Sequence, residues 1–208
     1  MLIDLHIHES TYSSDSFLKL KRIVELAKAK GLDGICITDH DSMGLKAVAE
    51  AYSKEINFPI FVGVEYFSLQ GDITAWGIDS FPDTRVSAQE FIDFVQASRG
   101  FCIACHPFRN NNRGLEENLK TVQGLGGIEV LNGSTDLEAN RKALKYCTKL
   151  GLQPIGASDG HWESNVGKYV TWIPEYVTTV ENFVQVMRTQ KCRPAIWNGD
   201  HYDIVDSF

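Results

Sequence analysis

The residues that decide the fold are the first eight, Met1-Leu2-Ile3-Asp4-Leu5-His6-Ile7-His8, which predict a buried β-strand. Side chains alternate between the two faces of a strand, so Asp4, His6 and His8 share one face and the apolar residues pack behind them. Imidazole is the commonest metal ligand in proteins. The pattern therefore indicates a two-histidine metal site, with Asp4 placed to orient an imidazole ring. This segment alone also fits two ordinary histidines in an amphipathic edge strand.

Residues of the metal-ligand type follow further apolar strands along the chain. Predicted helices separate these strands; the first runs from about Leu18 to Lys30, after a loop that ends in the possible N-cap residues Asp15 and Ser16. The ligand-type residues at or just beyond the strand ends are His6, His8, His40, Glu65, His106, Asp159 and His161. Repeated strand-then-helix units, about seven in all, favour an α/β barrel smaller than the eightfold form. A parallel barrel collects its active site at this edge.

The number of converging ligands exceeds what one ion can use. Zinc takes about four ligands and manganese about six, so the pattern predicts a site with more than one metal ion. Glu65 is the only acidic residue that ends its strand, which makes it the candidate carboxylate to bridge two cations. Paired cations suit the hydrolysis of phosphate esters. A structural metal cluster is the alternative, although structural zinc sites are usually thiolate-rich and local in sequence.

Bulk properties exclude several classes of protein. The 208 residues include 20 Lys and Arg against 27 Asp and Glu, which gives a net charge of −7. We expect no bulk nucleic-acid partner, because the sequence shows no Lys/Arg stripe. We expect no membrane span, because no apolar segment reaches the length that spanning requires. The five cysteines are odd in number and mostly lie in apolar runs, which favours a reducing, cytoplasmic location. No linker interrupts the chain, so residues 1–208 are predicted to form one domain.

The ordered motifs resemble those of the PHP (polymerase and histidinol phosphatase) family. The motifs that carry the resemblance are Asp4-Leu-His6-Ile-His8, Thr38-Asp39-His40, Gly63-Val-Glu65, His106-Pro107 and Ser158-Asp159-Gly160-His161. They span residues 1–171, and residues 172–208 would complete the domain. The resemblance implies a distorted (β/α)7 TIM-like barrel and a phosphoesterase that uses two or three divalent ions, often zinc, manganese or iron.

The resemblance also implies a distribution of ligands among three ions. The first ion would be held by His6, His8, Glu65 and Asp159, the second by Glu65 and His106, and the third by Asp15, His40 and His161. Asp15 matches a position where the family has Asp or His, and it could equally be only a helix N-cap. Thr74 stands where the family often has a further histidine. The second ion is therefore expected to bind weakly.

Several residues are candidates for catalysis or substrate binding rather than for metal ligation. Arg109 resembles the family's phosphate-binding arginine, and its planar guanidinium suits a bidentate grip on a phosphoryl group. We take Arg109 and Asp39 as candidate catalytic residues, and Lys168 as a candidate assistant in substrate binding that no motif supports. Glu129 ends a strand and is either a partner of a metal ligand or a simple rim carboxylate.

The leading hypothesis is a metal-dependent phosphoesterase that hydrolyses a small phosphomonoester through a metal-activated water. A metal-dependent amidohydrolase is the alternative enzyme, because the same activation of water cleaves C–N bonds. A proofreading or regulatory PHP module that acts with a polymerase partner is a third hypothesis. The sequence identifies neither the substrate nor the oligomeric state.

Overall fold

The computed structural model describes residues 1–207, and eleven strands, five α-helices and one 3-10 helix lie within them. In chain order the elements are β1 (Leu2–Ile7), α1 (Leu20–Ala29), β2 (Gly34–Ile37), α2 (Lys46–Ile56), β3 (Ile60–Val62), β4 (Val64–Phe67), β5 (Asp72–Trp76), α3 (Ala88–Ala97), β6 (Phe101–Ala104), η1 (Glu116–Lys120), β7 (Gly127–Asn132), α4 (Leu137–Leu150), β8 (Gln153–Ala157), β9 (Tyr169–Trp172), α5 (Val180–Thr189), β10 (Arg193–Trp197) and β11 (Tyr202–Ile204). The class is α/β, as predicted.

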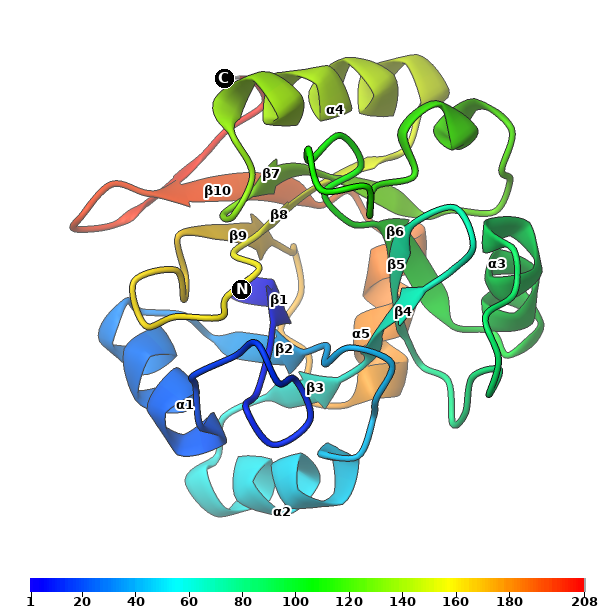
Figure 1. The fold of residues 1–208 in the computed structure, drawn as a ribbon. Helices are drawn as coiled ribbons and strands as arrows, with labels where there is room; N and C mark the ends of the chain where they lie inside the picture. Colours follow the sequence, from blue (N-terminus) through cyan, green and yellow to red (C-terminus); the bar gives the residue numbers. More distant parts are fainter. Residues whose placement is uncertain (208) are drawn as a thin grey trace.

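The strands form two sheets, with the orders β11-β10-β9-β1-β2-β3 and β4-β5-β6-β7-β8. The pairs β1–β2, β2–β3, β6–β7 and β7–β8 are parallel, whereas β4–β5–β6 and β1–β9–β10–β11 are antiparallel. Helices α1 and α2 lie outside β1–β3, and α3 and α4 lie outside the second sheet (Figure 1). The predicted closed (β/α)7 barrel is therefore not confirmed.

Local contacts join the two sheets where a strand ladder is missing. The hydroxyl of Thr171 in β9 donates to the carbonyl oxygen of Gly156 in β8 at 2.8 Å and accepts from the Gly156 N–H at 3.1 Å. On the other side the chain passes directly from β3 to β4 through Gly63, and an isolated bridge joins His40 to Glu65. These contacts bring the ends of strands from both sheets to one place.

Strand β1 supplies both core and site, as its alternating pattern predicts. Ile3, Leu5 and Ile7 are completely buried in the apolar core, and the intervening Asp4 and His6 are completely buried too. An isolated parallel bridge joins Ile7, at the end of β1, to Gly160 in the loop after β8. Burial of both faces explains why β1 reads as a core strand and not as the edge strand considered above.

Predicted turns and caps are partly confirmed. Ser87 and Glu90 form the predicted capping box at the start of α3, and β4 and β5 form the predicted hairpin. Helix α1 begins later than predicted, after Lys19, so neither Asp15 nor Ser16 caps it. The antiparallel strand β11 near the C-terminus was not predicted, because its short, polar sequence carries little periodic signal.

Gly63 allows the chain to cross between sheets two residues before Glu65. A Cβ at Gly63 would lie 2.4 Å from the carbonyl oxygen of Ala75 and 2.5 Å from Cδ1 of Trp76. We predict that Gly63→Ala lowers the free energy of unfolding by about 1–3 kcal/mol through overpacking, as measured by urea denaturation. Gly31→Ala is the control, since a Cβ there meets nothing within 4 Å and adds only the strain of a φ of +74°. A smaller loss for Gly63→Ala than for Gly31→Ala would contradict the packing argument.

Candidate metal centre

The structure brings all eight predicted ligands together. Six of them, Asp15, His40, Glu65, His106, Asp159 and His161, line a cavity of about 400 Å³. His6 and His8 are completely buried and contact the cavity residues Glu65 and Asp159. The candidate ligands come from β1 and the loop after it, from β4 and from the loops that follow β2, β6 and β8, so the predicted convergence of strand ends is correct.

The Glu65 carboxylate is the centre of the cluster. Its Oε1 lies 2.9 Å from Nε2 of His106 and 3.6 Å from Nε2 of His6. Its Oε2 lies 2.6 Å from Nδ1 of His40 and 3.5 Å from Nε2 of His8. One carboxylate thus faces four imidazole rings, two on each oxygen, which is the arrangement expected of a carboxylate that bridges cations.

Two further aspartates complete the arrangement. Oδ1 of Asp159 lies 3.4 Å from both Nε2 of His8 and Nδ1 of His161. Oδ2 of Asp15 lies 3.1 Å from Nε2 of His40 and 3.3 Å from Nε2 of His161. Asp15 therefore belongs to the cluster, and the N-cap alternative is wrong.

The donor atoms fit a group of divalent ions. Nε2 of His6 and Nε2 of His8 face each other at 2.9 Å. Nδ1 of His40 and Oε2 of Glu65 are buried and close together, yet neither has a partner with hydrogen-bond geometry. Ligand atoms within 4.8 Å of one another form several sets: His6 with His8 and Asp159, His8 with His40 and His161, Glu65 with Asp72 and His106, and His6 with Glu65 and Cys105. Nitrogen and oxygen donors in this number suit zinc, manganese or iron.

Asp72 is a candidate ligand that the sequence analysis missed. It is buried at the start of β5, and one of its oxygens lies 3.8 Å from Nε2 of His106. Thr74 is two residues further along the same face, directly opposite Glu65 in the register of β4 and β5, and does not line the cavity. Asp72, and not Thr74, therefore joins Glu65 and His106 in the second set of candidate ligand atoms. The available signal was the alternation of β5, which places both residues on one side.

Asp72 is paired with an arginine from the loop after β6. Arg113 donates from Nε and Nη2 to the two carboxylate oxygens at 2.6 and 2.8 Å. Burial and the nearby charge of Glu65 raise the pKa of Asp72 to about 6, although Arg113 opposes the shift. Arg113 therefore offsets the negative charge that Asp72 would otherwise add beside Glu65.

Glu129 holds the ring of His6. Its Oε1 lies 2.7 Å from Nδ1 of His6, and its Oε2 accepts from the backbone N–H of His106 at 2.9 Å and from the side-chain amide of Asn132 at 2.8 Å. A hydrogen bond at Nδ1 leaves Nε2 of His6 free to face the cluster. Of the two roles considered for Glu129, the structure therefore favours that of a partner to a candidate ligand, His6. The prediction that Asp4 orients a ring is wrong, because Asp4 accepts from backbone N–H groups of His6, Ser158 and Gly167.

Asp39 lies behind the cluster, outside the residues that line the cavity. Its Oδ1 accepts from the backbone N–H of Glu9 at 2.6 Å and from the hydroxyl of Ser13 at 2.8 Å. The same hydroxyl lies 3.2 Å from Nδ1 of His8. Asp39 is therefore connected to a ligand through Ser13, and burial raises its pKa to about 6.

The two predicted substrate-binding residues are placed differently. Arg109 lines the cavity, is 26% exposed, and donates from Nη1 to Oδ2 of Asp159 at 2.7 Å. Lys168 is exposed and lies outside the cavity, where its ammonium group donates to the carbonyl oxygen of Gly133 at 2.8 Å. The structure thus brings Arg109 to the site and leaves Lys168 away from it.

Burial and close charges shift the protonation of the cluster. Burial lowers the pKa of His8 to about 3. Burial also disfavours the charged form of His6, but the carboxylates of Glu129 and Glu65 outweigh it and hold this pKa well above its ordinary value. For Glu65, burial opposes ionisation, yet the surrounding histidines, first of all His6, keep its pKa well below the usual range. Glu65 is therefore anionic, as a carboxylate that binds cations must be.

Comparison with known families places the chain. Residues 4–156 match the PHP domain family, and residues 138–192 match a family described as PHP-associated. The chain belongs to the PHP domain family. An uncharacterized protein of Methanocaldococcus jannaschii is 28% identical to this PHP chain over 141 residues, which cover 64% of this chain and 82% of the relative.

Solved structures resemble this PHP chain in fold. A two-domain protein of Bacteroides vulgatus, described as containing a predicted PHP-like metal-dependent phosphoesterase, has a TM-score of 0.71 at 18% identity and covers 93% of this chain and 64% of that one. An amidohydrolase of Chromobacterium violaceum with bound sulfate and no metal has a TM-score of 0.68 at 19% identity and covers 89% and 96% of the two chains. At this level of identity the likeness concerns the fold alone.

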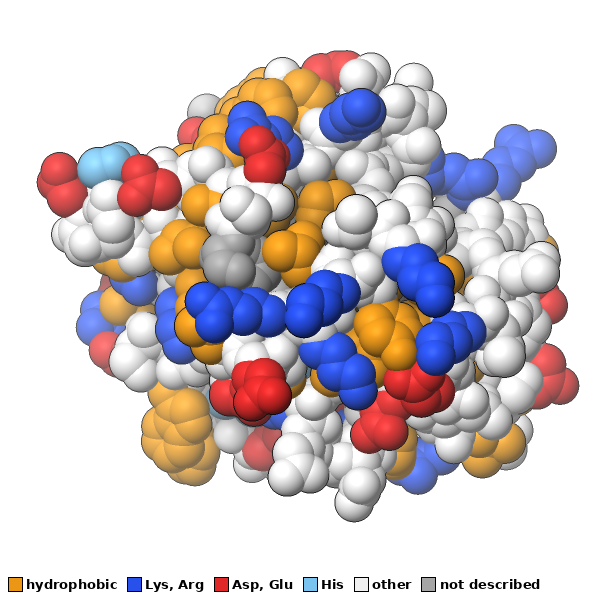
Figure 2. Space-filling view, turned by 90° about the horizontal axis from the view of Figure 1, so that it is seen from above, with side chains coloured by type: hydrophobic (Ala, Val, Ile, Leu, Met, Phe, Trp, Pro, Cys, Tyr) orange, Lys and Arg blue, Asp and Glu red, His pale blue; other side chains and the backbone are white. Residues whose placement is uncertain are grey.

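The surface does not test the expectation that the protein has no bulk nucleic-acid partner. Figure 2 shows Lys and Arg side chains gathered over the face that carries α4. Four exposed basic residues of that helix are Arg141, Lys142, Lys145 and Lys149. None of them lines the metal cavity. In residues 1–207 no helix combines the length and apolarity needed to cross a membrane.

The role of Asp72 can be tested by counting metal ions. We predict that Asp72→Ala loses about one ion per chain after exhaustive dialysis, because the set formed with Glu65 and His106 would then keep only two protein ligands. Thr74→Ala is the matched control from the same face of β5 and should retain the wild-type count. Elemental analysis of the dialysed proteins measures both. Equal metal content in wild type and Asp72→Ala would show that Asp72 is not a ligand.

Proposed function

We propose that this PHP protein is a metal-dependent phosphoesterase that hydrolyses a small phosphomonoester. The observation that carries the proposal is the Glu65 carboxylate, whose two oxygens face four histidines within 3.6 Å. A carboxylate in this position holds cations close together, and closely spaced cations are the arrangement that suits displacement at phosphorus.

The ligands of the cluster would hold two or three divalent ions. His6, His8 and Asp159 form one set, Glu65, Asp72 and His106 a second, and His40, His161 and Asp15 a third. When bound, such ions lower the pKa of a coordinated water and polarise the oxygens of a phosphoryl group. Zinc, manganese and iron all accept this mixture of imidazole and carboxylate ligands.

Arg109 is the residue that we propose for gripping the phosphoryl group. In residues 1–207 the only hydrogen bond from its guanidinium uses Nη1. The other N–H groups of this rigid, planar group therefore remain available to a substrate. Asp159 holds that plane at the cavity, so the arginine is ordered before the substrate arrives. A preorganised, charged donor stabilises the negative charge that develops on phosphoryl oxygens during the reaction.

The cavity favours a small substrate. Its volume of about 400 Å³ lies at the low end of the range for small-molecule sites. Polar groups of Asn111, Ser134 and Arg113 line it beside the ligands, and Trp162 contributes an apolar wall. This lining supports a phosphomonoester with a small polar body. The sulfate bound to the Chromobacterium violaceum protein supports oxyanion binding in a related fold.

Asp39 acts in this proposal as a positioning residue and not as a catalytic one. Its carboxylate reaches the cluster only through the hydroxyl of Ser13, which contacts His8. Glu129 does the same for His6 by direct contact. Both carboxylates would set the orientation of ligand rings, while the residues that touch substrate are those of the cavity wall.

Amide hydrolysis is the second candidate reaction, because one of the similar structures is described as an amidohydrolase. The same cluster would activate water for attack on a carbonyl carbon. The guanidinium of Arg109 distinguishes the two reactions, since it matches a phosphoryl group and a neutral amide offers it no charge. The hypothesis of a module that serves a polymerase partner has no support among these observations.

The proposed function is tested by chelation and a substrate panel. We expect hydrolysis of p-nitrophenyl phosphate and of small phosphomonoesters, loss of this activity after exhaustive chelation, and recovery with manganese or zinc. Amide and lactone substrates assayed with the same metals are the comparison. Phosphate release that persists without metal, or a clear preference for amides, would refute the proposal.

Arg109 provides a prediction for substrate binding. Arg109→Ala should lower kcat/KM for the best phosphomonoester by about 100-fold, through effects on both kcat and KM, since the charge contact strengthens in the transition state. Arg109→Lys should recover little, because an ammonium cannot reproduce the planar fork. Arg193→Ala is the control, since Arg193 pairs with Asp206 on the surface. Wild-type kinetics in Arg109→Ala would disprove the phosphate contact.

A further inference from the structure

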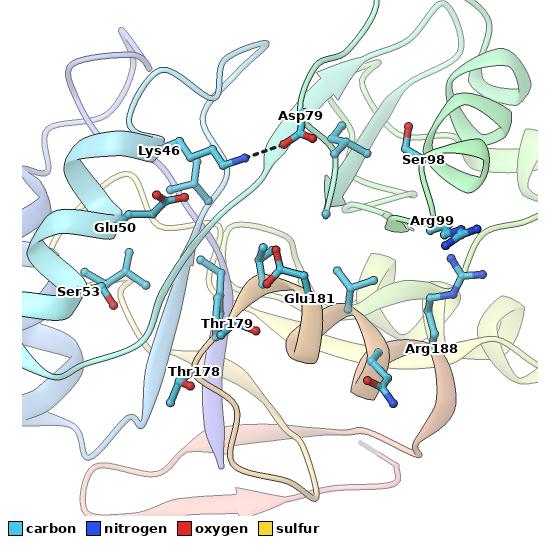
Figure 3. A pocket seen from close by; sticks show the side chains of 18 of the residues that line it. Lys46, Glu50, Ser53, Asp79, Ser98, Arg99, Thr178, Thr179, Glu181 and Arg188 are labelled. Carbon is cyan, nitrogen blue, oxygen red and sulfur yellow. Dashed lines mark hydrogen bonds and ion pairs between the residues drawn. The ribbon is translucent and has the colours of Figure 1, made fainter.

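A second and larger cavity lies away from the metal cluster. It has a volume of about 880 Å³ and is formed by α2, α5 and the segment that connects β5 to α3 (Figure 3). No residue lines both this cavity and the metal cavity. Strand β5 leads from one to the other, because Asp72 at its start lines the metal cavity and Gly77, just after its end, lines the second.

The lining of this second cavity is apolar over one part of its surface. Phe61 and Val62 from β3, Ile78 after β5, and Val184 on α5 contribute side chains to it. All of these except Val62 are largely buried, so they form a floor and not a projecting patch. A concave apolar surface of this size fits a ligand with an apolar body.

One end of the cavity carries two arginines. Arg99 and Arg188 line the cavity and point toward one another in Figure 3. Arg188 donates from Nη1 to the carbonyl oxygen of Gly100 at 2.8 Å, which ties it to the residue that follows Arg99. Neither arginine forms an ion pair with a carboxylate in residues 1–207, and Arg99 forms no hydrogen bond from its side chain there.

Arg99 has a left-handed backbone conformation, which is strained for a residue other than glycine. Helix α3 ends at Ala97 with Ser98 as its C-cap, and Arg99 follows with a φ of +59°. The N–H of Gly100 bonds back to the carbonyl oxygen of Val95 at 2.9 Å, which is the closing bond of a helix C-terminus of this kind. Glycine is the usual residue at such a left-handed position. The chain instead carries an arginine there, and a strained residue at the wall of a cavity is a candidate for a functional role.

The opposite end of the cavity has a net negative charge. Glu50 on α2, Glu181 in the first turn of α5 and Asp79 line it against two lysines of α2, Lys46 and Lys54. Glu181 already supplies the negative charge that a helix N-terminus favours. Lys46 on α2 pairs with Asp79 at 3.0 Å across the cavity edge, so that this lysine is neutralised (Figure 3). A second anionic group on a ligand would therefore meet repulsion at this end.

We propose that this cavity is a binding site for an amphipathic monoanion, a molecule with one carboxylate head and an apolar body. The head contacts the guanidinium groups of Arg99 and Arg188, and the body lies on the floor formed by Phe61, Ile78 and Val184. The acidic end selects against ligands that are charged at both ends. The site is independent of the metal cluster and of the reaction proposed for it.

Binding of matched eight-carbon probes tests the proposal on the full-length, metal-loaded protein. Octanoate should bind in calorimetric titration and raise the Tm, whereas 1-octanol lacks the charged head and octanedioate carries a second one. Both should bind at least about tenfold more weakly than octanoate, as expected for one lost or one repulsive charged contact. Equal binding of octanol would show that the arginines play no part, and equal binding of octanedioate would show that the acidic end does not discriminate.

Substitutions locate the binding to this cavity. Arg99→Gly should weaken octanoate binding about tenfold, yet leave the Tm of the free protein unchanged or higher, because glycine relieves the left-handed strain. Arg188→Gln should weaken binding similarly. Lys54→Gln is the matched control, since Lys54 lines the same cavity on α2 and its loss changes the net charge equally. Unchanged affinity in both arginine variants, or no octanoate binding to the wild type, would overturn the proposal.

Discussion

The contact between Glu65 and four histidines is the constraint on which the rest of the site depends. A carboxylate that is 1% exposed is costly unless opposite charge surrounds it. Here the pKa values of His6 on β1 and of His40 and His106 on the loops after β2 and β6 are raised, and these rings supply that charge. Three segments far apart in sequence must therefore meet at one side chain. The fold places them within hydrogen-bond range or just beyond it, and cations bound there would supply the remaining compensation.

The architecture of two sheets serves this convergence. Strand β1 and its parallel neighbours bring His6, His8 and His40 from one sheet, while β4, β6 and β8 bring Glu65, His106 and Asp159 from the other. The chain crosses between the sheets at Gly63, where a side chain has no room. His106 and Asp159 both have positive φ values, +29° and +50°. Strain of this kind at ligand positions is typical of sites that the surrounding structure holds in place.

A shell of carboxylates and hydroxyls surrounds the ligands and sets their orientation. Glu129 holds His6 directly, and Asp39 reaches His8 through Ser13. Two arginines from the loop after β6 balance the acidic side of the cavity, Arg109 against Asp159 and Arg113 against Asp72. The arginines that line the second cavity, Arg99 and Arg188, differ from these, because neither forms an ion pair with a carboxylate in residues 1–207.

The sequence by itself determined the α/β class, the strand that begins the chain, and which eight candidate ligands gather in one cluster. These inferences rest on local rules, namely the alternation of side chains along a strand and the gathering of strand ends at one edge of a sheet. Tertiary structure alone decided which side chains contact the cluster directly and which ones orient the side chains that do. Whether Asp72 or Thr74 faces His106, and whether Asp4 or Glu129 holds His6, depends on the register between strands and on contacts over as many as 123 residues. Local sequence carries no signal for such pairings, and for the same reason it predicted a single closed barrel where two sheets meet.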